Sequence, residues 1–235
     1  MKNLFLGNKL TYKLYLYYDL YLRNFYKKKT GYYSQWGEDV FIYKFFKDLK
    51  NGFYFDIGSY HPIKYSNTCL LHKQGWKGVN IDANQTSIDL FNIARPKDKN
   101  ICAALSDTSD YANYFIDHSL APVNTLDEKM YKKLKSTFFK KTKIKKIKTL
   151  KLDDLNQNLI ILSKTDFLNL DIEGFDLQVL KQIDLKRSKI KLAAIETHYP
   201  EGDKTKDCDA IFSYLDDNFY TVYKRVGPTT LFKKK

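Results

Sequence analysis

The sequence has 235 residues, of which 43% are hydrophobic and 16% aromatic, so it can bury the core of a single α/β domain. Its cysteines, Cys69, Cys102 and Cys208, are scattered, and no pair has the C-x-x-C spacing of a metal site. We expect no secretory signal and no transmembrane helix, because no run of about 18 apolar residues occurs. These features predict a cytoplasmic protein with free thiols and without membrane-spanning segments.

The net charge of +13 is concentrated in two segments. Residues 1–30 carry a net charge of +6, and residues 129–151 carry eleven lysines without an acid, which leaves the rest of the chain slightly acidic. Such lysines either lie on a solvated surface or contact an anionic partner. The basic N-terminus also leaves open a peripheral contact with the inner face of a membrane.

The first predicted element is a helix in residues 10–26, where leucines and tyrosines follow a helical stripe, although alternating leucines also fit a strand. We interpret residues 1–31 as a basic, aromatic helical extension and residues 32–235 as the main domain. The extension either packs on this domain or contacts a membrane.

From residue 52 onward, apolar strands alternate with helical segments. Strands are predicted at 53–58, 79–84, 101–107, 111–117, 147–152, 166–174 and 191–198, with a closing hairpin at 220–235. Helices are predicted at 64–74, 87–94, 175–183 and 208–218, and a short one begins at Asp153 or Asp154. This alternation predicts βαβ units and a mostly parallel sheet, with the lysine-rich segment as an insertion.

Polar clusters follow four of the predicted strands. The clusters are Asp56-Ile-Gly58-Ser59, Asp82-Ala-Asn84, Asp171-Ile-Glu173-Gly174 and Glu196-Thr-His198. Burial disfavours acids inside strands, and ligands of open α/β sheets bind at the carboxyl ends of the strands. The clusters therefore indicate a binding site at that edge.

Asp82 comes 24 residues after Gly58, where a Rossmann-like fold presents a carboxylate to the ribose of a nucleotide. The first turn has one glycine instead of the three of a dinucleotide motif, so a nucleoside without phosphates fits better. S-adenosylmethionine is such a ligand, and Asp56 can help to orient its ammonium group. The alternative role of Asp82 is a helix cap.

Several ordered motifs carry a resemblance to a known family: YSQWGEDVFIYKFF, GFYFDIGSYHPIKYSNTCLLHKQGWKGVNIDAN, LNLDIEGFDLQVL and IETH. With them, residues 32–235 resemble the FkbM family of S-adenosylmethionine-dependent methyltransferases. The resemblance implies a Rossmann-like class I methyltransferase fold, with a seven-stranded, mostly parallel sheet and a C-terminal antiparallel hairpin. It also implies O-methylation of a sugar or polyketide hydroxyl, and we expect a sugar or glycan acceptor.

The resemblance assigns the site residue by residue. Gln35 and Glu38 match an S-Q-x-G-E-D motif, Asp56, Gly58, His61 and Pro62 the first turn, Ser66, Asn67 and Thr68 an S-N-T motif, Asp82 the ribose acid, and Asp171, Glu173 and Gly174 a D-x-E-G motif. We add Ser59 of the first turn, and Ser106 and Asp107 where the third strand approaches the adenine. A helix cap is the alternative role for Asn67 and Thr68.

Methyl transfer to a hydroxyl benefits from a base, because a hydroxyl is a poor nucleophile. Asp171, Glu173 and His198 end neighbouring strands and are the predicted catalytic residues, with Asp171 or His198 as the base. The same three side chains could instead hold Mg²⁺ or Mn²⁺. In a third interpretation, Asp171 and Glu173 only bind the N-terminus of the next helix.

Two alternative functions are a nucleic-acid methyltransferase and a non-catalytic binding module. A nucleic-acid methyltransferase would fit the lysines, but the sequence has no D/N-P-P-Y motif. A non-catalytic binding module would not need the acids at the strand ends. We expect an anionic or lipid-linked glycan to contact the lysine-rich segment, with RNA as the second choice. The lysines predicted to affect the KM of the acceptor are Lys140, Lys141, Lys143, Lys145 and Lys146.

Overall fold

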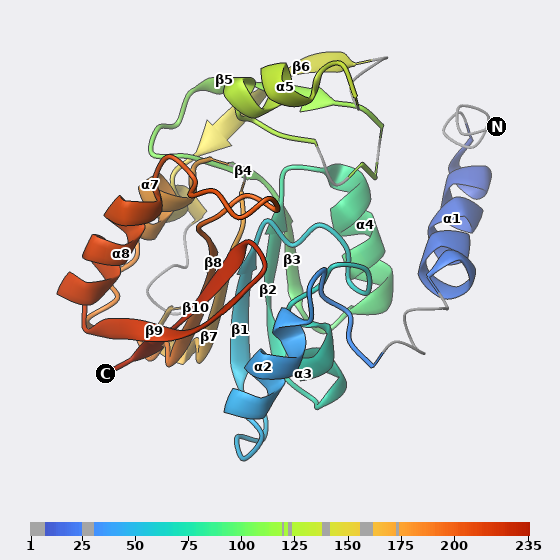
Figure 1. Ribbon diagram of the computed structural model, residues 1–235. Coiled ribbons are helices and arrows are strands. Elements are labelled where there is room, and N and C mark those ends of the chain that lie inside the picture. Colours follow the sequence, from blue (N-terminus) through green and yellow to red (C-terminus); the bar gives the residue numbers. More distant parts are fainter. Residues whose placement is uncertain are drawn as a thin grey trace.

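A computed structural model describes residues 8–24, 31–118, 120–121, 124–137, 142–155, 162–172 and 174–235. Its main sheet has seven strands in the order β3-β2-β1-β7-β8-β10-β9 (Figure 1). Their bounds are β1 Phe53–Ile57, β2 Lys77–Asp82, β3 Lys99–Cys102, β7 Phe167–Leu170, β8 Leu192–Glu196, β9 Tyr220–Val226 and β10 Thr229–Lys234. The first five are parallel, whereas β10 is antiparallel to β8 and β9. The predicted sheet and its C-terminal hairpin are confirmed.

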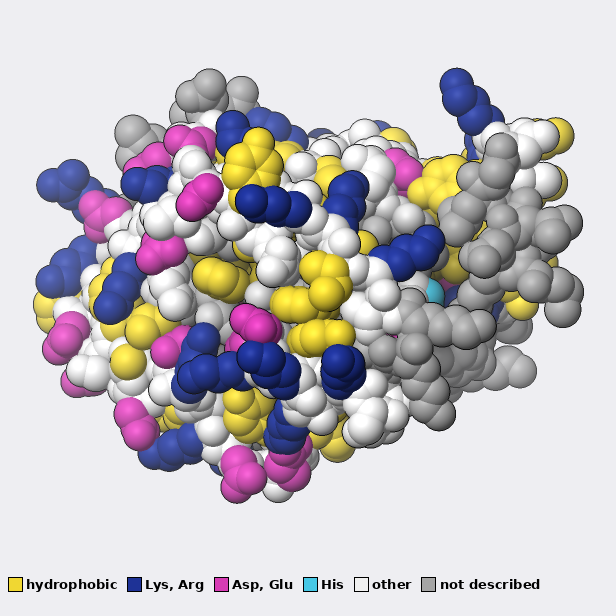
Figure 2. Space-filling view, turned by 90° about the horizontal axis from the view of Figure 1, so that it is seen from above, with side chains coloured by type: hydrophobic (Ala, Val, Ile, Leu, Met, Phe, Trp, Pro, Cys, Tyr) yellow, Lys and Arg dark blue, Asp and Glu magenta, His cyan; other side chains and the backbone are white. Residues whose placement is uncertain are grey.

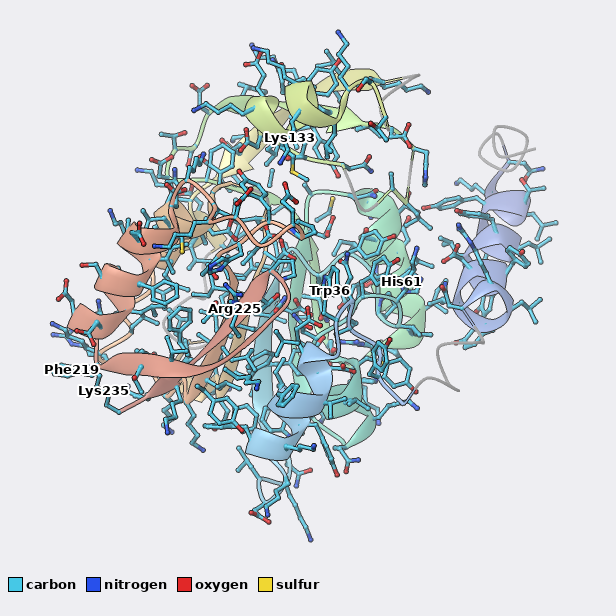
Figure 3. The ribbon with its side chains drawn as sticks, viewed as in Figure 1. Trp36, His61, Lys133, Phe219, Arg225 and Lys235 are labelled. Atoms are coloured by element: carbon cyan, nitrogen blue, oxygen red, sulfur yellow. The ribbon has the colours of Figure 1, made fainter. Side chains whose placement is uncertain are left out.

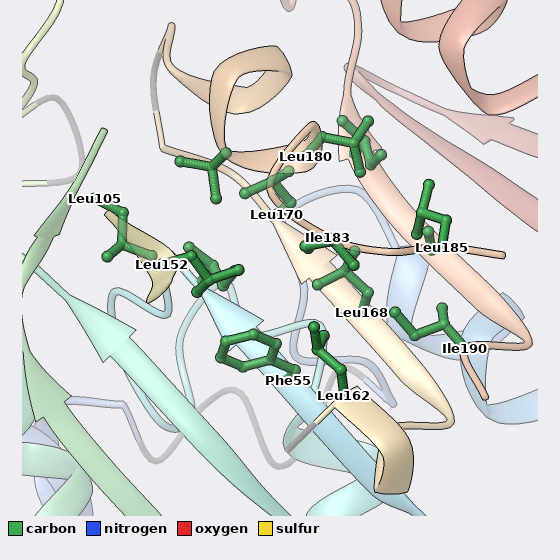
Figure 4. Packing of buried hydrophobic residues seen from close by; sticks show 14 of the residues in the cluster. Phe55, Leu105, Leu152, Leu162, Leu168, Leu170, Leu180, Ile183, Leu185 and Ile190 are labelled. Carbon is green, nitrogen blue, oxygen red and sulfur yellow. The ribbon is translucent and has the colours of Figure 1, made fainter. Parts of the chain in front are cut away.

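Helices cover both faces of this sheet because successive strand residues point to opposite faces. In β1, Phe55 joins the large core under α7 (Asp176–Leu180) and α8 (Cys208–Asp217), part of which Figure 4 shows. Its neighbour Tyr54 joins a second core with α2 (Glu38–Phe45) and α3 (Cys69–Lys73). Helix α4 (Gln85–Ala94) packs beside β2 and β3. Helix α3 is shorter than the predicted helix at 64–74.

A smaller sheet, in the order β4-β6-β5, covers the edge where the parallel strands end (Figure 1). It consists of β4 (Ala104–Leu105), β5 (Tyr111–Ile116) and β6 (Lys143–Leu150), next to helix α5 (Glu128–Leu134). The predicted strand at 101–107 is divided: β3 belongs to the main sheet, and the chain then turns to pair β4 with β6. The strand predicted at 147–152 begins earlier, at Lys143, and ends at Leu150. The short helix predicted from Asp153 or Asp154 is a 3-10 helix, Leu152–Leu155.

The part of the N-terminal extension that the structure describes, residues 8–24, is helical, as predicted. Helix α1 (Lys9–Tyr18) continues as a π-helix, Asp19–Arg23, and lies beside α4 (Figure 1). Leu16 and Leu20 are buried in a small core with Leu90 of α4. Within the described ranges, no helix is both long and apolar enough to cross a membrane.

One buried guanidinium connects β1 with the loop that follows it. Arg95 follows α4 and is only 1% exposed. It donates hydrogen bonds to the carbonyl of Pro62 (2.6 Å), to Ser66 Oγ (3.1 Å), to Thr68 Oγ1 (2.8 Å) and to the hydroxyl of Tyr54 (3.1 Å). A buried cation is stable only when its donors are satisfied in this way.

The first prediction concerns the stability that Arg95 provides. Arg95→Met keeps much of the side-chain volume but leaves the four acceptors without their donor, and it removes the positive charge near Asp56. We expect the free energy of unfolding to fall by about 3–5 kcal/mol in urea denaturation. Arg187→Met is the control, because that side chain is 90% exposed and its ion pair should contribute less than about 1 kcal/mol. Equal losses in the two variants would contradict the assignment.

Candidate active site

A pocket opens where β1, β2 and β7 end, between the main sheet and the smaller one. Nine of the predicted site residues line it: Gln35, Glu38, Asp56, Gly58, Ser59, Ser66, Asn67, Asp82 and Asp171. The smaller sheet and the chain that follows β5 contribute Tyr114, Asn124 and Thr125. The sequence motifs therefore converge on one cavity.

The turn after β1 is held close to the neighbouring strands. The amides of Gly58 and Ser59 donate to the carbonyl of Ile81 at 2.9 and 3.0 Å. Gly58 has a φ of +80°, and a Cβ at this position would lie 1.7 Å from the carbonyl oxygen of Asp171. Only glycine fits there, because both the left-handed conformation and the close approach of another backbone exclude a side chain. This glycine allows two strand ends to meet.

Asp82 is held at the end of β2 by two backbone amides. Tyr60 N donates to its Oδ2 at 2.8 Å and Asn84 N to its Oδ1 at 2.7 Å. Burial raises the pKa of Asp82 to about 6. Ser87, in the first turn of α4, also lines the pocket, and its buried hydroxyl has no hydrogen-bond partner in the described structure. A ligand with hydroxyl groups would therefore find hydrogen-bonding partners in Asp82 and Ser87.

Asp56 is engaged with protein groups. Its carboxylate accepts hydrogen bonds from Thr68 Oγ1 at 2.6 Å and from Asn169 Nδ2 at 2.9 Å. Asn169 in turn accepts from Asn67 Nδ2 at 2.8 Å. Burial raises the pKa of Asp56, although these bonds oppose that shift. The network fixes Asn67 at the pocket wall, and a direct contact of Asp56 with a ligand ammonium stays a prediction.

The S-Q-x-G-E-D motif places Trp36 at the mouth of the pocket. Glu38 Oε2 accepts from the backbone amide of Trp36 at 2.8 Å, and burial raises the pKa of Glu38. The indole packs on Gly227 in the turn between β9 and β10, where a Cβ would come within 2.6 Å of the ring. Trp36 is nevertheless 48% exposed and lines the cavity (Figure 3). An open aromatic surface thus borders the site.

Asp171 lies at the end of β7 and is reached by solvent through the pocket. Desolvation by the protein around the cavity, followed by repulsion from Asp176, Glu38 and two further carboxylates, raises its pKa to about 7. The side chain that binds the turn before α7 is Asp176, which accepts from Ile172 N and Gly174 N at 3.1 Å each. Asp171 therefore does not serve as the cap of that helix.

Seven described residues of the predicted site and its motifs do not line the pocket: His61, Pro62, Thr68, Ser106, Asp107, Gly174 and His198. Ser106 hydrogen-bonds to Asp107 at 3.1 Å, while Ala103, Ala104 and Leu105 form that side of the cavity. Ser106 and Asp107 thus lie behind the lining of this pocket, and their contact with adenine stays a prediction.

His198 is also turned away from the pocket. Its Nδ1 lies 2.8 Å from the hydroxyl of Thr197, and Glu196 lines the pocket in its place. The expected convergence of His198 with Asp171 is not observed, because the strand ends at Glu196 and His198 pairs with Lys204. Glu173 lies outside the described residues. Among those described, no group of His, Cys, Asp and Glu has the arrangement of a metal site.

Several lining residues were missed from the sequence: Trp36, Tyr60, Ser87, Asn124, Asn169 and Glu196. A signal existed for two of them. Asn169 lies two positions before Asp171 in a predicted strand. Glu196 begins the polar cluster Glu196-Thr-His198, from which only His198 is predicted to be catalytic. Nothing local distinguishes Ser87 or Asn124 from surface residues.

Residues 56–222 match the family model of the methyltransferase FkbM domain. The chain belongs to the FkbM methyltransferase family. Two solved structures are similar: a TehB-like S-adenosylmethionine-dependent methyltransferase from Corynebacterium glutamicum and methyltransferase FkbM from Methylobacillus flagellatus. The first has 11% identity and a TM-score of 0.47, over 92% of this chain and 97% of the other. The second has 15% identity and a TM-score of 0.42, over 78% of this chain and 43% of the other. No curated protein matches the sequence.

The methyl donor of this FkbM methyltransferase is S-adenosylmethionine, and the residues present fit it. Asp82 keeps free lone pairs for a ribose diol, and the unpartnered Ser87 hydroxyl lies on the same side of the pocket. Gly58 leaves the floor free of a side chain, and several carboxylates around the cavity complement a cation.

The second prediction tests Asp82 as the ribose ligand. Asp82→Ala removes a pair of hydrogen bonds to a diol, so the Kd for S-adenosylmethionine in calorimetry should rise roughly 30- to 150-fold. The wild-type affinity should also decrease below about pH 6, because protonated Asp82 accepts less well. Asp184→Ala, an exposed carboxylate in a distant loop, is the control. Unchanged affinity in Asp82→Ala would show that the ribose binds elsewhere.

Proposed function

We propose that this FkbM methyltransferase methylates a hydroxyl group of a sugar or glycan, with Asp171 as the general base. The observation that supports this proposal is a carboxylate with a pKa of about 7 at the end of β7, inside the pocket that contains Asp82. A base with a pKa near the working pH is the most effective one for a hydroxyl.

In this reaction the acceptor hydroxyl must lose a proton, whereas the leaving group needs none. When bound, S-adenosylmethionine supplies an electrophilic methyl group and leaves as a neutral thioether. Ionised Asp171 accepts the proton of the acceptor hydroxyl as the new oxygen–carbon bond forms. The neighbouring carboxylates Asp176 and Glu38 make that protonation favourable, because adding the proton reduces their repulsion.

The mouth of the pocket supports a carbohydrate acceptor. Sugars combine apolar ring faces with many hydroxyl groups, so their sites join an aromatic surface to hydrogen-bonding side chains. Trp36 provides the aromatic surface, and Gln35, Asn124 and Glu196 provide polar groups on the lining. The acceptor hydroxyl would thus be positioned between Trp36 and Asp171.

The third prediction separates Asp171 from the other candidate bases. Asp171→Asn keeps the shape but cannot accept the proton, so kcat should fall about 100-fold or more while donor affinity changes little. In the wild type, kcat/KM should decrease about tenfold per pH unit below about pH 7, since the raised pKa keeps Asp171 protonated there. At saturating S-adenosylmethionine, which keeps the titration of Asp82 out of the measurement, this decline should be absent from Asp171→Asn.

Two further variants complete the test. Asp107→Asn changes an exposed carboxylate that does not line the pocket, and His198→Ala removes the alternative base. Both should keep a kcat within about threefold of wild type. A loss in His198→Ala with normal turnover in Asp171→Asn would transfer the base to His198.

The acceptor that we propose is anionic, and the smaller sheet supports this. Lys145 is directly opposite Tyr114 in the β5–β6 pair, so the two side chains share a face, and Tyr114 lines the pocket. Lys143 lies two residues before Lys145 and therefore shares that face. Lys146 lies on the opposite face, where its Nζ is 5.4 Å from the centre of the Tyr111 ring. Lys140 and Lys141 lie outside the described residues. Lys143 and Lys145 support the proposal of an acceptor with phosphate or uronate groups.

The fourth prediction uses the two faces of β6. In a methyl-transfer screen over nucleotide sugars and glycans, acceptors with phosphate or uronate groups should be preferred. The double variant Lys143→Gln and Lys145→Gln should raise the KM for such an acceptor about tenfold at low salt, and the effect should fade near 1 M salt. The control is Lys146→Gln with Lys148→Gln, which removes the same charge from the opposite face. Equal effects would indicate general attraction, and methylation of an RNA oligomer instead of glycans would overturn the proposal.

A further inference from the structure

The extension presents one continuous face to solvent. Its members are Lys9, Leu10, Lys13, Leu14, Tyr17, Tyr18, Tyr21 and Leu22. The three leucines are 59–69% exposed and the three tyrosines 42–51% exposed. Figure 2 shows hydrophobic side chains near a basic one at the edge of the molecule where α1 lies. Leucine, tyrosine and lysine together, without an acid, are the composition of a helix that lies in a membrane interface.

The opposite face fixes the extension to the domain. Asp19, the only acid in residues 8–24, is turned inward and is 2% exposed. It accepts hydrogen bonds from His61 Nε2 at 3.0 Å and from Arg23 Nη1 at 2.7 Å. His61 Nδ1 accepts two backbone amides, so the proton is on Nε2 and the imidazole is neutral. Burial lowers the pKa of His61, in agreement with this state.

The second anchor is the hydroxyl of Tyr12, which donates to Asp89 of α4 at 2.6 Å. With Leu16 and Leu20 buried against α4, the leucines and lysines of the exposed face cannot turn inward. The exposed face is therefore a property of the folded protein and not of a loosely attached tail.

The charge on this face decides between the occupants that could cover it. A second copy would form a two-fold interface, in which each face meets itself. Lys9 and Lys13 would then meet a surface without any acid, and their like charges would oppose association. An anionic lipid surface supplies the missing negative charge and also accepts the leucines.

We propose that α1 and the π-helix dock this enzyme on an anionic phospholipid surface. The leucines enter the boundary of the acyl chains, the tyrosines lie at the level of the head groups, and the lysines contact lipid phosphates. The anchor is close to the pocket, because His61 adjoins Tyr60, whose amide holds Asp82. Docking would thus hold the donor pocket at the membrane surface.

The fifth prediction is tested by sedimentation of the full chain with phospholipid vesicles. Wild type should bind vesicles with about 30% anionic lipid at about 0.1 M salt and bind neutral vesicles much more weakly. Lys9→Gln with Lys13→Gln should weaken binding about 10- to 30-fold. Leu10→Ser, Leu14→Ser and Leu22→Ser combined should weaken it at least tenfold. Because all these side chains are exposed, the melting temperature and the donor affinity should not change.

Matched controls come from the rest of the surface. Ile144→Ser and Phe219→Ser remove hydrophobic side chains that are 58% and 57% exposed, and Lys181→Gln with Lys189→Gln removes two exposed charges. These variants should bind vesicles like wild type. The proposal is overturned if wild type does not sediment with anionic vesicles, or if the controls lose as much binding as the α1 variants. It is also overturned if the leucine variant converts a dimer to a monomer in gel filtration, which would assign the face to a second copy.

Discussion

The site depends on one buried cation. Arg95 binds three positions of the loop between β1 and α3, and through Thr68 it is connected to Asp56 and then to Asn169 of β7. These groups are far apart in the sequence, and Asp56 and Asn169 are 113 residues apart. A buried charge tolerates few alternative arrangements, because any displacement leaves donors or acceptors unsatisfied. The position of the loop that carries Ser66 and Asn67 is therefore a consequence of where Arg95 is buried.

Charge is distributed in two zones that match two kinds of ligand. Carboxylates surround the pocket. Desolvation raises the pKa of Asp171, and repulsion from the other carboxylates raises it further. A cationic donor reduces this repulsion when it binds, and this electrostatic effect favours its binding. Lysines lie outside the pocket, among them those of the smaller sheet and of the N-terminal helix. A chain with a net charge of +13 can thus contain an acidic pocket without conflict.

The extension shows how one helix can satisfy two interpretations of the same sequence. Packing on the domain and contact with a membrane were alternatives for residues 1–31, but they require different faces. The inward face uses Leu16, Leu20 and Asp19, and the outward face contains the lysines and the exposed leucines. His61, assigned to the donor from the family motif, is a part of the inward contact. Its place in the first turn makes it a connection between the extension and the pocket.

The features that depend on local pattern can be predicted from the sequence. Alternating apolar segments predicted the parallel sheet, and the acids after the strands predicted the edge where Asp82 and Asp171 line one pocket, because strands of a parallel sheet end together. Tertiary structure alone decided which neighbouring side chain faces the cavity. Glu196 lines it and His198 does not, and Arg95, which reads as a helix end, is the centre of the polar network. These outcomes depend on contacts between segments that are far apart in the chain, and the local periodicity of a sequence cannot predict such contacts.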